Sequence, residues 1–240
     1  MGAMPLHPLL PTCAMCAWHG ACQARAVPRR AAAGERLFHQ DTPFVALYTV
    51  ASGCVRTCTR AGPGRERVTG FAFPGDLLGL DAIASGRHGG DALVLEEARV
   101  CAIPYDLLED ALAASPLLQR RFQQLMSAQI LHAQSMRRTL NQHDAAARVA
   151  GFLLDLSDRL RARGLPDDRL HLPMSRLDIG SYLGLRIETV SHMLTRLHQA
   201  GCLNVRLREI RIVDVAALRQ VAGPLSGSPA AAPSSGPARR

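Results

Sequence analysis

One stretch of the chain constrains its fold more than any other: residues 174–203, MSRLDIGSYLGLRIETVSHMLTRLHQAGCL. It predicts two short helices joined by a tight turn. Ser175 is suited to the N-cap of the first helix, and Asp178 completes an acidic variant of the capping box three residues later. Gly184 interrupts the helical pattern, and a second helix is expected over 187–199.

The second helix has an apolar face and a polar face. At about 100° per residue, one side gathers the apolar residues Ile187, Val190, Met193, Leu194 and Leu197. The opposite side gathers short hydrogen-bonding side chains, namely Glu188, Ser191, His192 and Thr195. A reader of the DNA major groove needs this combination, whereas an ordinary pair of amphipathic helices does not require the polar face.

Two neighbouring features favour the DNA reader over the ordinary helix pair. Arg186 and Arg196 flank the second helix and are placed to meet phosphates. The segments 203–205 and 210–213 then predict a small hairpin, which would be the wing of a winged helix-turn-helix.

The segment DIGSYLGLRIETVSHML resembles the DNA-binding motif of the Crp/Fnr family, in the branch named for fumarate and nitrate reduction regulation. In that branch the reading helix carries E-x-x-S-R and recognises half-sites similar to TTGAT. Glu188 and Ser191 match, but His192 stands where the family has Arg and cannot make the bidentate guanine contact. The DNA-contacting residues that the resemblance implies are Arg186, Glu188, Thr189, Ser191, His192 and Arg196.

The composition narrows the class of protein. A net charge of +8 and a pI near 9.7 favour a polyanionic partner, and 4% aromatic residues argue against base stacking on single strands. No run of about 18 apolar residues predicts a membrane span, and no export signal is recognisable. Seven cysteines, an odd number, argue against a disulfide framework. We therefore expect a cytoplasmic protein.

Three of the cysteines lie close together near the N-terminus. Cys13, Cys16 and Cys22 form the pattern C-x2-C-x5-C among prolines and glycine, which indicates a loop. Three thiols on one loop can wrap a single centre, with a fourth ligand from elsewhere. The residues alone leave zinc, a redox pair and incidental thiols open.

The Fnr-like branch has the same cysteine pattern and a fourth cysteine in its sensory domain, which together hold an oxygen-labile [4Fe–4S] cluster. The resemblance implies that Cys13, Cys16, Cys22 and Cys101 are the ligands here, with zinc-bound or metal-free thiols as the alternative. One departure is that only eleven residues separate Cys22 from Gly34, where the family usually has a helix and its first strand. The remaining cysteines, Cys54, Cys58 and Cys202, are expected to be small buried residues.

Short β-like runs punctuated by glycine and proline fill the region 34–104. The expected strands are 44–51, 55–59, 68–71, 92–95 and 99–103. The pattern resembles the double-stranded β-roll of the family, a cyclic-nucleotide-binding-like jelly roll, and indicates an α+β fold class. A cupin-type metal enzyme is the distant alternative, since His39 and His88 stand alone.

Members of the family that bind cyclic AMP carry a G-E turn followed by R-S-A or R-T-A. The corresponding stretch here, GLDAIASGRHGGDALVL, has no Glu after Gly79 and no Arg-Ser-Ala. A cyclic phosphate would lose its charge-assisted hydrogen bonds, so we do not expect cyclic AMP. The loop 87–90 is the counterpart of one that can touch RNA polymerase in the family.

The longest helical pattern covers 105–141, and the resemblance implies that it is the dimerisation helix of the family; a helix buried against its own domain is the alternative. The apolar residues of this pattern repeat nearly every seven positions, which predicts the seam of a homodimer, and Arg137 lies close to this stripe. The predicted interface residues are Phe122, Met126, Ile130, Ala133, Met136, Arg137 and Leu140. A helix is also expected after residue 143, with Val149, Phe152, Leu153 and Leu156 on its core face.

The predicted divisions are a cysteine-rich arm (1–33), the β-roll (34–113), the dimerisation helix (114–142), the winged helix-turn-helix (143–222) and a disordered tail (223–240). Together they predict a non-enzymatic, DNA-binding transcription regulator that responds to oxygen, redox state or nitric oxide.

Overall fold

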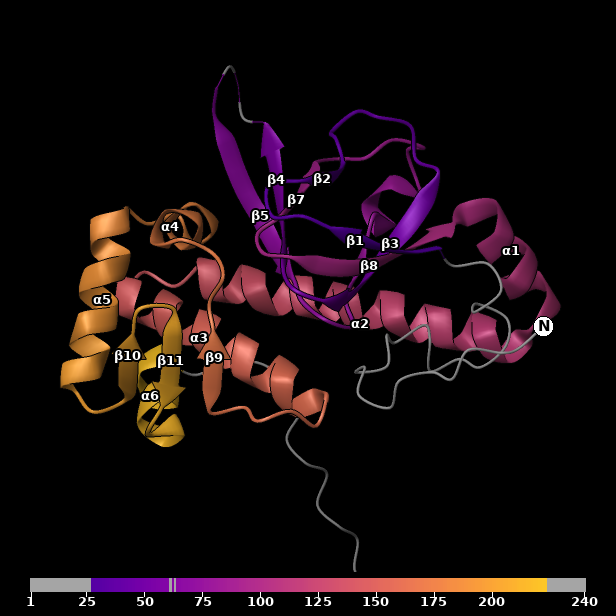
Figure 1. Ribbon diagram of the computed structural model, residues 1–240. Helices are drawn as coiled ribbons and strands as arrows, with labels where there is room; N and C mark the ends of the chain where they lie inside the picture. The colour runs from indigo at the N-terminus through magenta and orange to yellow at the C-terminus, as the bar shows by residue number, and fades with distance from the viewer. Residues whose placement is uncertain (1–26, 61, 63, 224–240) are drawn as a thin grey trace, which may run out of the picture. The chain divides into compact units, whose positions relative to one another are not determined.

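The computed structural model describes residues 27–223 except 61 and 63, and these form two compact units. The first unit comprises the described part of 1–131 together with 171–191. The second comprises 132–170 and the described part of 192–240. Figure 1 labels their helices and strands. None of the helices in the described ranges is both long and apolar enough to cross a membrane.

The first unit contains a double-stranded β-roll made of two four-stranded antiparallel sheets. One sheet has the order β1 (Val27–Ala31), β8 (Ala98–Pro104), β3 (Ala46–Ser52), β6 (Leu77–Leu78). The other has the order β2 (Arg36–Phe38), β7 (Asp91–Val94), β4 (Val55–Arg60), β5 (Glu66–Ala72). Small and β-branched side chains of both sheets, among them Val50, Val55, Val94 and Val100, form a fully buried cluster. This confirms the predicted β-roll.

The five predicted strands are present as β3, β4, β5, β7 and β8, with somewhat different ends. The strand β1 was not predicted, and it lies at the end of the segment 1–33 that the sequence assigned to the cysteine-rich arm. Four of the five β1 side chains are exposed, so the strand lacks the alternating pattern that would reveal it. Backbone pairing with β8 makes the segment a strand. The strand β1 belongs to the short stretch of eleven residues between Cys22 and Gly34.

The predicted continuous helix over 105–141 is two helices, α1 (Tyr105–Ala114) and α2 (Pro116–Leu140). Ser115 separates them in an extended conformation, with φ −136° and ψ 101°. The residue before a proline avoids the helical region, which explains the break. The Ser115 hydroxyl accepts a hydrogen bond from the Leu118 N–H at 3.3 Å and so caps the second helix.

The reading motif and the segments around it supply the remaining elements. The helix α3 (Ala145–Ala162) is capped by Asp144 and buries the four predicted core residues, Val149, Phe152, Leu153 and Leu156. It is followed by β9 (Arg169–His171), which was not predicted, and by α4 (Arg176–Leu183) and α5 (Ile187–Gln199). The chain then forms β10 (Leu203–Arg206), β11 (Glu209–Ile212) and α6 (Val215–Ala222). The predicted disordered tail, apart from Gly223, lies outside the described residues.

A histidine is buried within the β-roll. His88 is 2% exposed, its ring stacks on Phe38 at 3.8 Å between centroids, and Phe44 meets it edge-on at 5.7 Å. Its Nδ1 has no hydrogen-bond partner among the described residues. Burial lowers the pKa of His88 below its ordinary value, and the nearby Asp81 carboxylate only partly opposes this. The fold therefore favours the neutral form of this ring.

Replacing His88 with Phe should remove an acid-dependent loss of stability. The unfolded chain protonates this histidine near pH 6.5, whereas the folded chain resists protonation. The native protein should therefore lose unfolding free energy as the pH falls below about 6.5, by at most about 1.4 kcal/mol per pH unit. Above that pH the ring is neutral in both states and contributes no pH dependence.

Urea unfolding at about pH 7.5 and about pH 5.5 measures this difference. His88→Phe should lose less stability between the two conditions than the native chain, while the exposed control His143→Gln should behave like the native chain. Equal losses in the native protein and His88→Phe would contradict the assignment.

Candidate DNA interface and cysteine site

The predicted helix-turn-helix is present, and its local interactions explain why. The Ser175 hydroxyl accepts from the Asp178 N–H, and the Asp178 carboxylate accepts from the Ser175 N–H, which completes the capping box. Gly184 ends α4 in the left-handed conformation, with φ 66°. The turn also depends on Gly180, because a Cβ there would lie 2.6 Å from the Leu185 carbonyl oxygen. The chain can therefore make this tight turn only with a glycine at 180.

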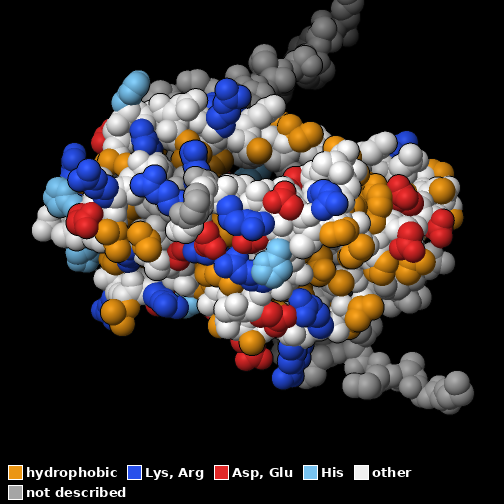
Figure 2. All heavy atoms as spheres, turned by 90° about the horizontal axis from the view of Figure 1, so that it is seen from above, with side chains coloured by type: hydrophobic (Ala, Val, Ile, Leu, Met, Phe, Trp, Pro, Cys, Tyr) orange, Lys and Arg blue, Asp and Glu red, His pale blue; other side chains and the backbone are white. Residues whose placement is uncertain are grey.

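The two faces of α5 are as the sequence predicted, with one exception. Val190, Met193, Leu194 and Leu197 are buried, whereas Glu188, Ser191, His192 and Thr195 are exposed. Ile187 is the exception, since it is 41% exposed at the start of the helix. Arg186 and Arg196 are exposed and Thr189 is partly exposed. All six predicted DNA-contacting residues are therefore accessible to solvent, and Figure 2 shows basic and histidine side chains gathered on the surface near α5.

The wing is a hairpin in which Arg206 pairs with Glu209 across a two-residue turn. Leu207 in that turn adopts φ 53° and is 94% exposed. Arg206 and Arg208 are exposed beside it. The Arg211 Nε lies 3.4 Å from an Asp168 carboxylate oxygen, so its charge is already partly neutralised. The two arginines nearest the tip are thus the ones best placed to meet phosphates.

Of the four predicted cluster ligands, the structure describes Cys101. It is partly exposed, lies in the middle of β8, and is paired with Pro28 of β1 and Thr49 of β3. Cys13, Cys16 and Cys22 lie outside the described residues. Cys54, Cys58 and Cys202 are buried, as predicted.

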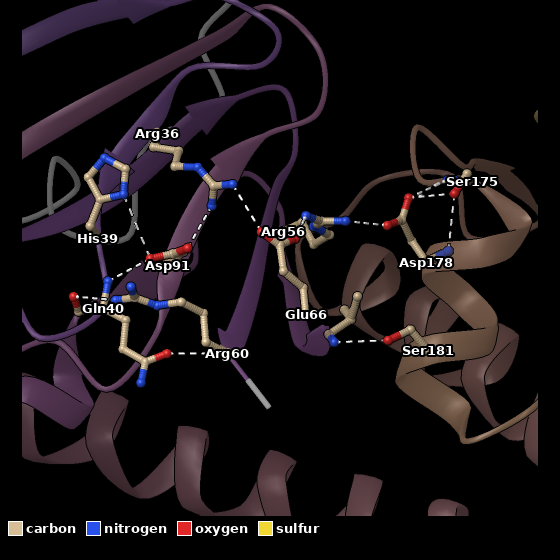
Figure 3. Close-up of polar contacts among 11 residues, drawn as sticks. Arg36, His39, Gln40, Arg56, Arg60, Glu66, Asp91, Ser175, Asp178 and Ser181 are labelled. Atoms are coloured by element: carbon tan, nitrogen blue, oxygen red, sulfur yellow. Dashed lines mark hydrogen bonds and ion pairs between the residues drawn. The ribbon is translucent and has the colours of Figure 1, made fainter. Parts of the chain in front are cut away.

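A second group of potential ligands lies on the β-roll, where no sequence pattern indicated a site. Cys58, Glu66 and Asp91 bring ligand atoms within 4.8 Å of one another. Both carboxylates are already bound by arginines: Asp91 meets Arg36 at 2.7 Å, and Glu66 meets Arg36 at 3.0 Å and Arg56 at 2.6 Å (Figure 3). Burial raises the pKa of the Cys58 thiol, which disfavours the thiolate that a metal needs. We interpret this group as an ion-pair network.

The loop that would face a cyclic nucleotide uses its polar groups internally. Gly79 adopts φ 90° before the short 3-10 helix Leu80–Ala82. Asp81 accepts a hydrogen bond from the Gly89 N–H at 3.1 Å, and Arg87 donates to the Asp41 carbonyl oxygen at 2.5 Å. These contacts agree with the expectation that cyclic AMP is not a ligand, which stays a prediction.

The predicted dimer stripe of α2 divides by burial. Phe122 is buried, and Met126 packs against the same core cluster of the β-roll. Met136 is also buried and Leu140 is partly buried. The exposed members are Ile130, Ala133 and Arg137.

Two family models match the chain. Residues 28–115 match the cyclic nucleotide-binding domain, and residues 147–221 match the Crp-like helix-turn-helix domain. Among curated proteins, the transcriptional activator protein FnrA of Stutzerimonas stutzeri is 40% identical over 190 residues, which is 79% of this chain and 78% of that protein. This chain belongs to the Crp/Fnr family of transcription regulators.

Two further proteins are similar to this Crp/Fnr regulator over most of its length. The fumarate and nitrate reduction regulatory protein of Escherichia coli K12 is 40% identical over 79% of this chain and 76% of its own length. The solved structure of FixK2 from Bradyrhizobium japonicum superposes with a TM-score of 0.73 at 31% identity, over 82% of this chain and 96% of that one. These matches replace the cupin-type interpretation of the β-roll.

Removing one wing arginine should lower the salt dependence of DNA binding. The slope of log K against log salt should fall by about 0.9 for each phosphate that the protein no longer contacts. We expect this for Arg208→Gln, and a smaller change for Arg211→Gln because Asp168 already shares that charge. Sequence preference should not change in either variant.

Fluorescence anisotropy over a salt series measures the slope, with Arg120→Gln on the exposed surface of α2 as the matched control. A slope that Arg208→Gln leaves unaltered would show that the wing tip faces away from the DNA backbone.

Proposed function

We propose that this regulator binds DNA as a homodimer and senses oxygen through a [4Fe–4S] cluster held by Cys13, Cys16, Cys22 and Cys101. The observation that carries the sensing proposal is the register of β1 against β8. Pro28 is the strand partner of Cys101, and β1 begins at Val27, five positions after Cys22. The chain that leads from the N-terminal cysteines thus runs directly alongside the fourth one.

The donor set suits this cofactor. Four cysteine thiolates are the usual ligands of a [4Fe–4S] cluster, and Cys101 is partly exposed rather than sealed in the core. When bound, the cluster would supply an oxygen-labile link between the N-terminal segment and β8. Cys101 would contribute by anchoring that link in a strand paired on both sides.

DNA reading is assigned to the polar face of α5. Glu188 can accept a hydrogen bond from a cytosine amino group, and Ser191 can contact a base edge or a thymine methyl group. His192 occupies the next position on the exposed face. These residues support recognition of a palindromic site with TTGAT-like halves, in which His192 makes a weaker guanine contact than an arginine would.

His192→Arg should restore a bidentate guanine contact and tighten binding to a TTGAT half-site by about 1–3 kcal/mol. Glu188→Ala should relax sequence preference more than it weakens nonspecific binding. Selection of binding sites from a randomised DNA pool measures both effects, with Arg120→Gln on the exposed surface of α2 as the control. Identical preferences in the native chain and both variants would refute this assignment of the helix.

The homodimer seam is assigned to the exposed part of α2. Ile130, Ala133 and Arg137 are spaced by three and then four residues, which places them on one helix face. Ile130 is 59% exposed, so a second copy would remove apolar surface from water. Arg137 would face its own copy near the two-fold axis, and the repulsion of like charges would weaken the dimer. Loss of the cluster would then be enough to dissociate the dimer. Contact with RNA polymerase through the loop at Arg87 is part of the same proposal.

Cluster loss should convert the dimer to monomer. Two variants should separate the effect of the cluster from the effect of the Arg137 charge. Under anaerobic conditions the native chain should be brown, contain acid-labile sulfide and run as a dimer, then shift towards monomer after brief air exposure. Cys101→Ser should be colourless and mainly monomeric, and Arg137→Leu should remain dimeric in air. Size-exclusion chromatography with iron and sulfide analysis measures these states, and Cys202→Ser is the matched control at a buried cysteine. Colourless native protein carrying stoichiometric zinc would favour the zinc alternative and contradict the cluster.

A further inference from the structure

The first helix of the reading motif is fastened to the β-roll through Arg56 (Figure 3). Arg56 on β4 places Nη1 2.6 Å from Oδ1 of Asp178 and Nη2 2.6 Å from Oε2 of Glu66. Its side chain is 14% exposed and that of Asp178 is 13% exposed. This pair is therefore screened less by solvent and salt than an ion pair on the open surface.

The Asp178 carboxylate serves two purposes at once. Its Oδ2 accepts from the Ser175 N–H at 3.0 Å and from the Ser175 hydroxyl at 2.6 Å, while Oδ1 meets Arg56. Burial alone would raise the pKa of this carboxyl, but the hydrogen bonds from Ser175 and Arg56 outweigh it and hold the pKa below its ordinary value. The group that caps α4 is thus also the group that Arg56 holds.

Two further contacts lie on the same face of α4. The Val68 N–H donates to the Ser181 hydroxyl at 3.0 Å, and the rings of Phe71 and Tyr182 meet edge-on at 5.3 Å between centroids. Residues 178, 181 and 182 are spaced so that they share one side of a helix. One face of α4 is therefore attached to β4 and β5 by an ion pair, a hydrogen bond and an aromatic contact.

The attachment extends to the base-reading residues. The turn 184–186 joins α4 to α5, and the Leu185 N–H donates to the Gly180 carbonyl oxygen at 2.8 Å. Residues 187–191, with Glu188 and Ser191, belong to the same compact unit as Arg56. Whatever fixes α4 on the β-roll also fixes the beginning of the reading helix.

We propose that Arg56 is a positioning residue for DNA reading, holding α4 and the first residues of α5 on the β-roll without touching DNA itself. A symmetric site requires two readers at a fixed spacing, and a reader that is already fixed loses less entropy when it binds. The buried Arg56 Nε has no hydrogen-bond partner among the described residues, so the attachment carries a desolvation cost. The proposal rests on DNA reading by α5.

The test measures DNA affinity of the full-length protein, prepared anaerobically, over a salt series. Arg56→Gln should weaken binding by between about 5-fold and about 150-fold, the usual range for coupling between sites. The salt slope and the sequence preference should stay unchanged, because Arg56 touches neither phosphate nor base. The matched control is Arg29→Gln, which removes another 2.6 Å ion pair, with Glu35, on the same β-roll and should leave affinity unaltered.

A double-mutant cycle with Asp178→Asn identifies the partner. That substitution also weakens the cap of α4, so the single variant should bind less well than Arg56→Gln. The double variant should be no weaker than Asp178→Asn alone, because the ion pair that both residues share is already broken. If Arg56→Gln does not fold by circular dichroism, Ser181→Ala on the same face of α4 should still lower affinity.

Three results would overturn the proposal. Unchanged or tighter binding by folded Arg56→Gln would show that the attachment does not favour reading. A salt slope reduced by about 0.9 would make Arg56 a phosphate contact instead. Additive decreases in affinity across the cycle would show that Arg56 and Asp178 act separately. The native protein in the same assay tests whether α5 reads DNA at all. Failure of that assignment would appear as absent sequence preference in the native protein, whereas failure of the positioning role would appear only in the Arg56 variant.

Discussion

Strand β8 is paired along its length with β1 on one side and with β3 on the other. This backbone pairing places Cys101 between two strands, next to the segment that arrives from the N-terminal cysteines. The same strand runs directly into α1 at Tyr105, which leads through Ser115 into α2. A change at Cys101 therefore acts on a strand that is continuous with the helices carrying the proposed dimer seam. Under the proposed function, this sheet register would link the cluster ligand Cys101 to the association of two chains.

A second set of interactions connects the β-roll to the reading motif. The charges alternate from Asp91 through Arg36, Glu66 and Arg56 to Asp178, and each neighbouring pair lies within 3.0 Å. Asp91 is 5% exposed on β7, while Asp178 completes the capping box of the first helix of the motif. Such a chain is physically contiguous, and networks of ion pairs are one kind of structure that carries coupling between sites. In this arrangement the β-roll and the first helix of the reader share direct contacts instead of being joined only by a linker.

The features that could be predicted from the sequence are those with local causes. The capping box joins residues three apart, and the faces of α5 follow from helical spacing, so both were predicted. The break at Ser115 also had a local signal in Pro116 that a purely periodic interpretation overlooked. By contrast β1 has exposed side chains and exists because of its pairing with distant β8. The attachment of Arg56 to Asp178 joins residues 122 positions apart, and no spacing rule predicts such a pair. The exposure of Ile187 likewise depends on where the helix packs, not on its period.

The proposed control of DNA binding by a [4Fe–4S] cluster, through Cys101 and the strand that carries it, can be measured directly. Oxygen is added stepwise to one anaerobic sample of native protein, and three quantities are followed on the same aliquots: visible absorbance, acid-labile sulfide and affinity for a palindromic TTGAT site. If the cluster controls binding, affinity falls in proportion to the cluster that remains. A protein that keeps full DNA affinity after all its sulfide has gone would contradict this control.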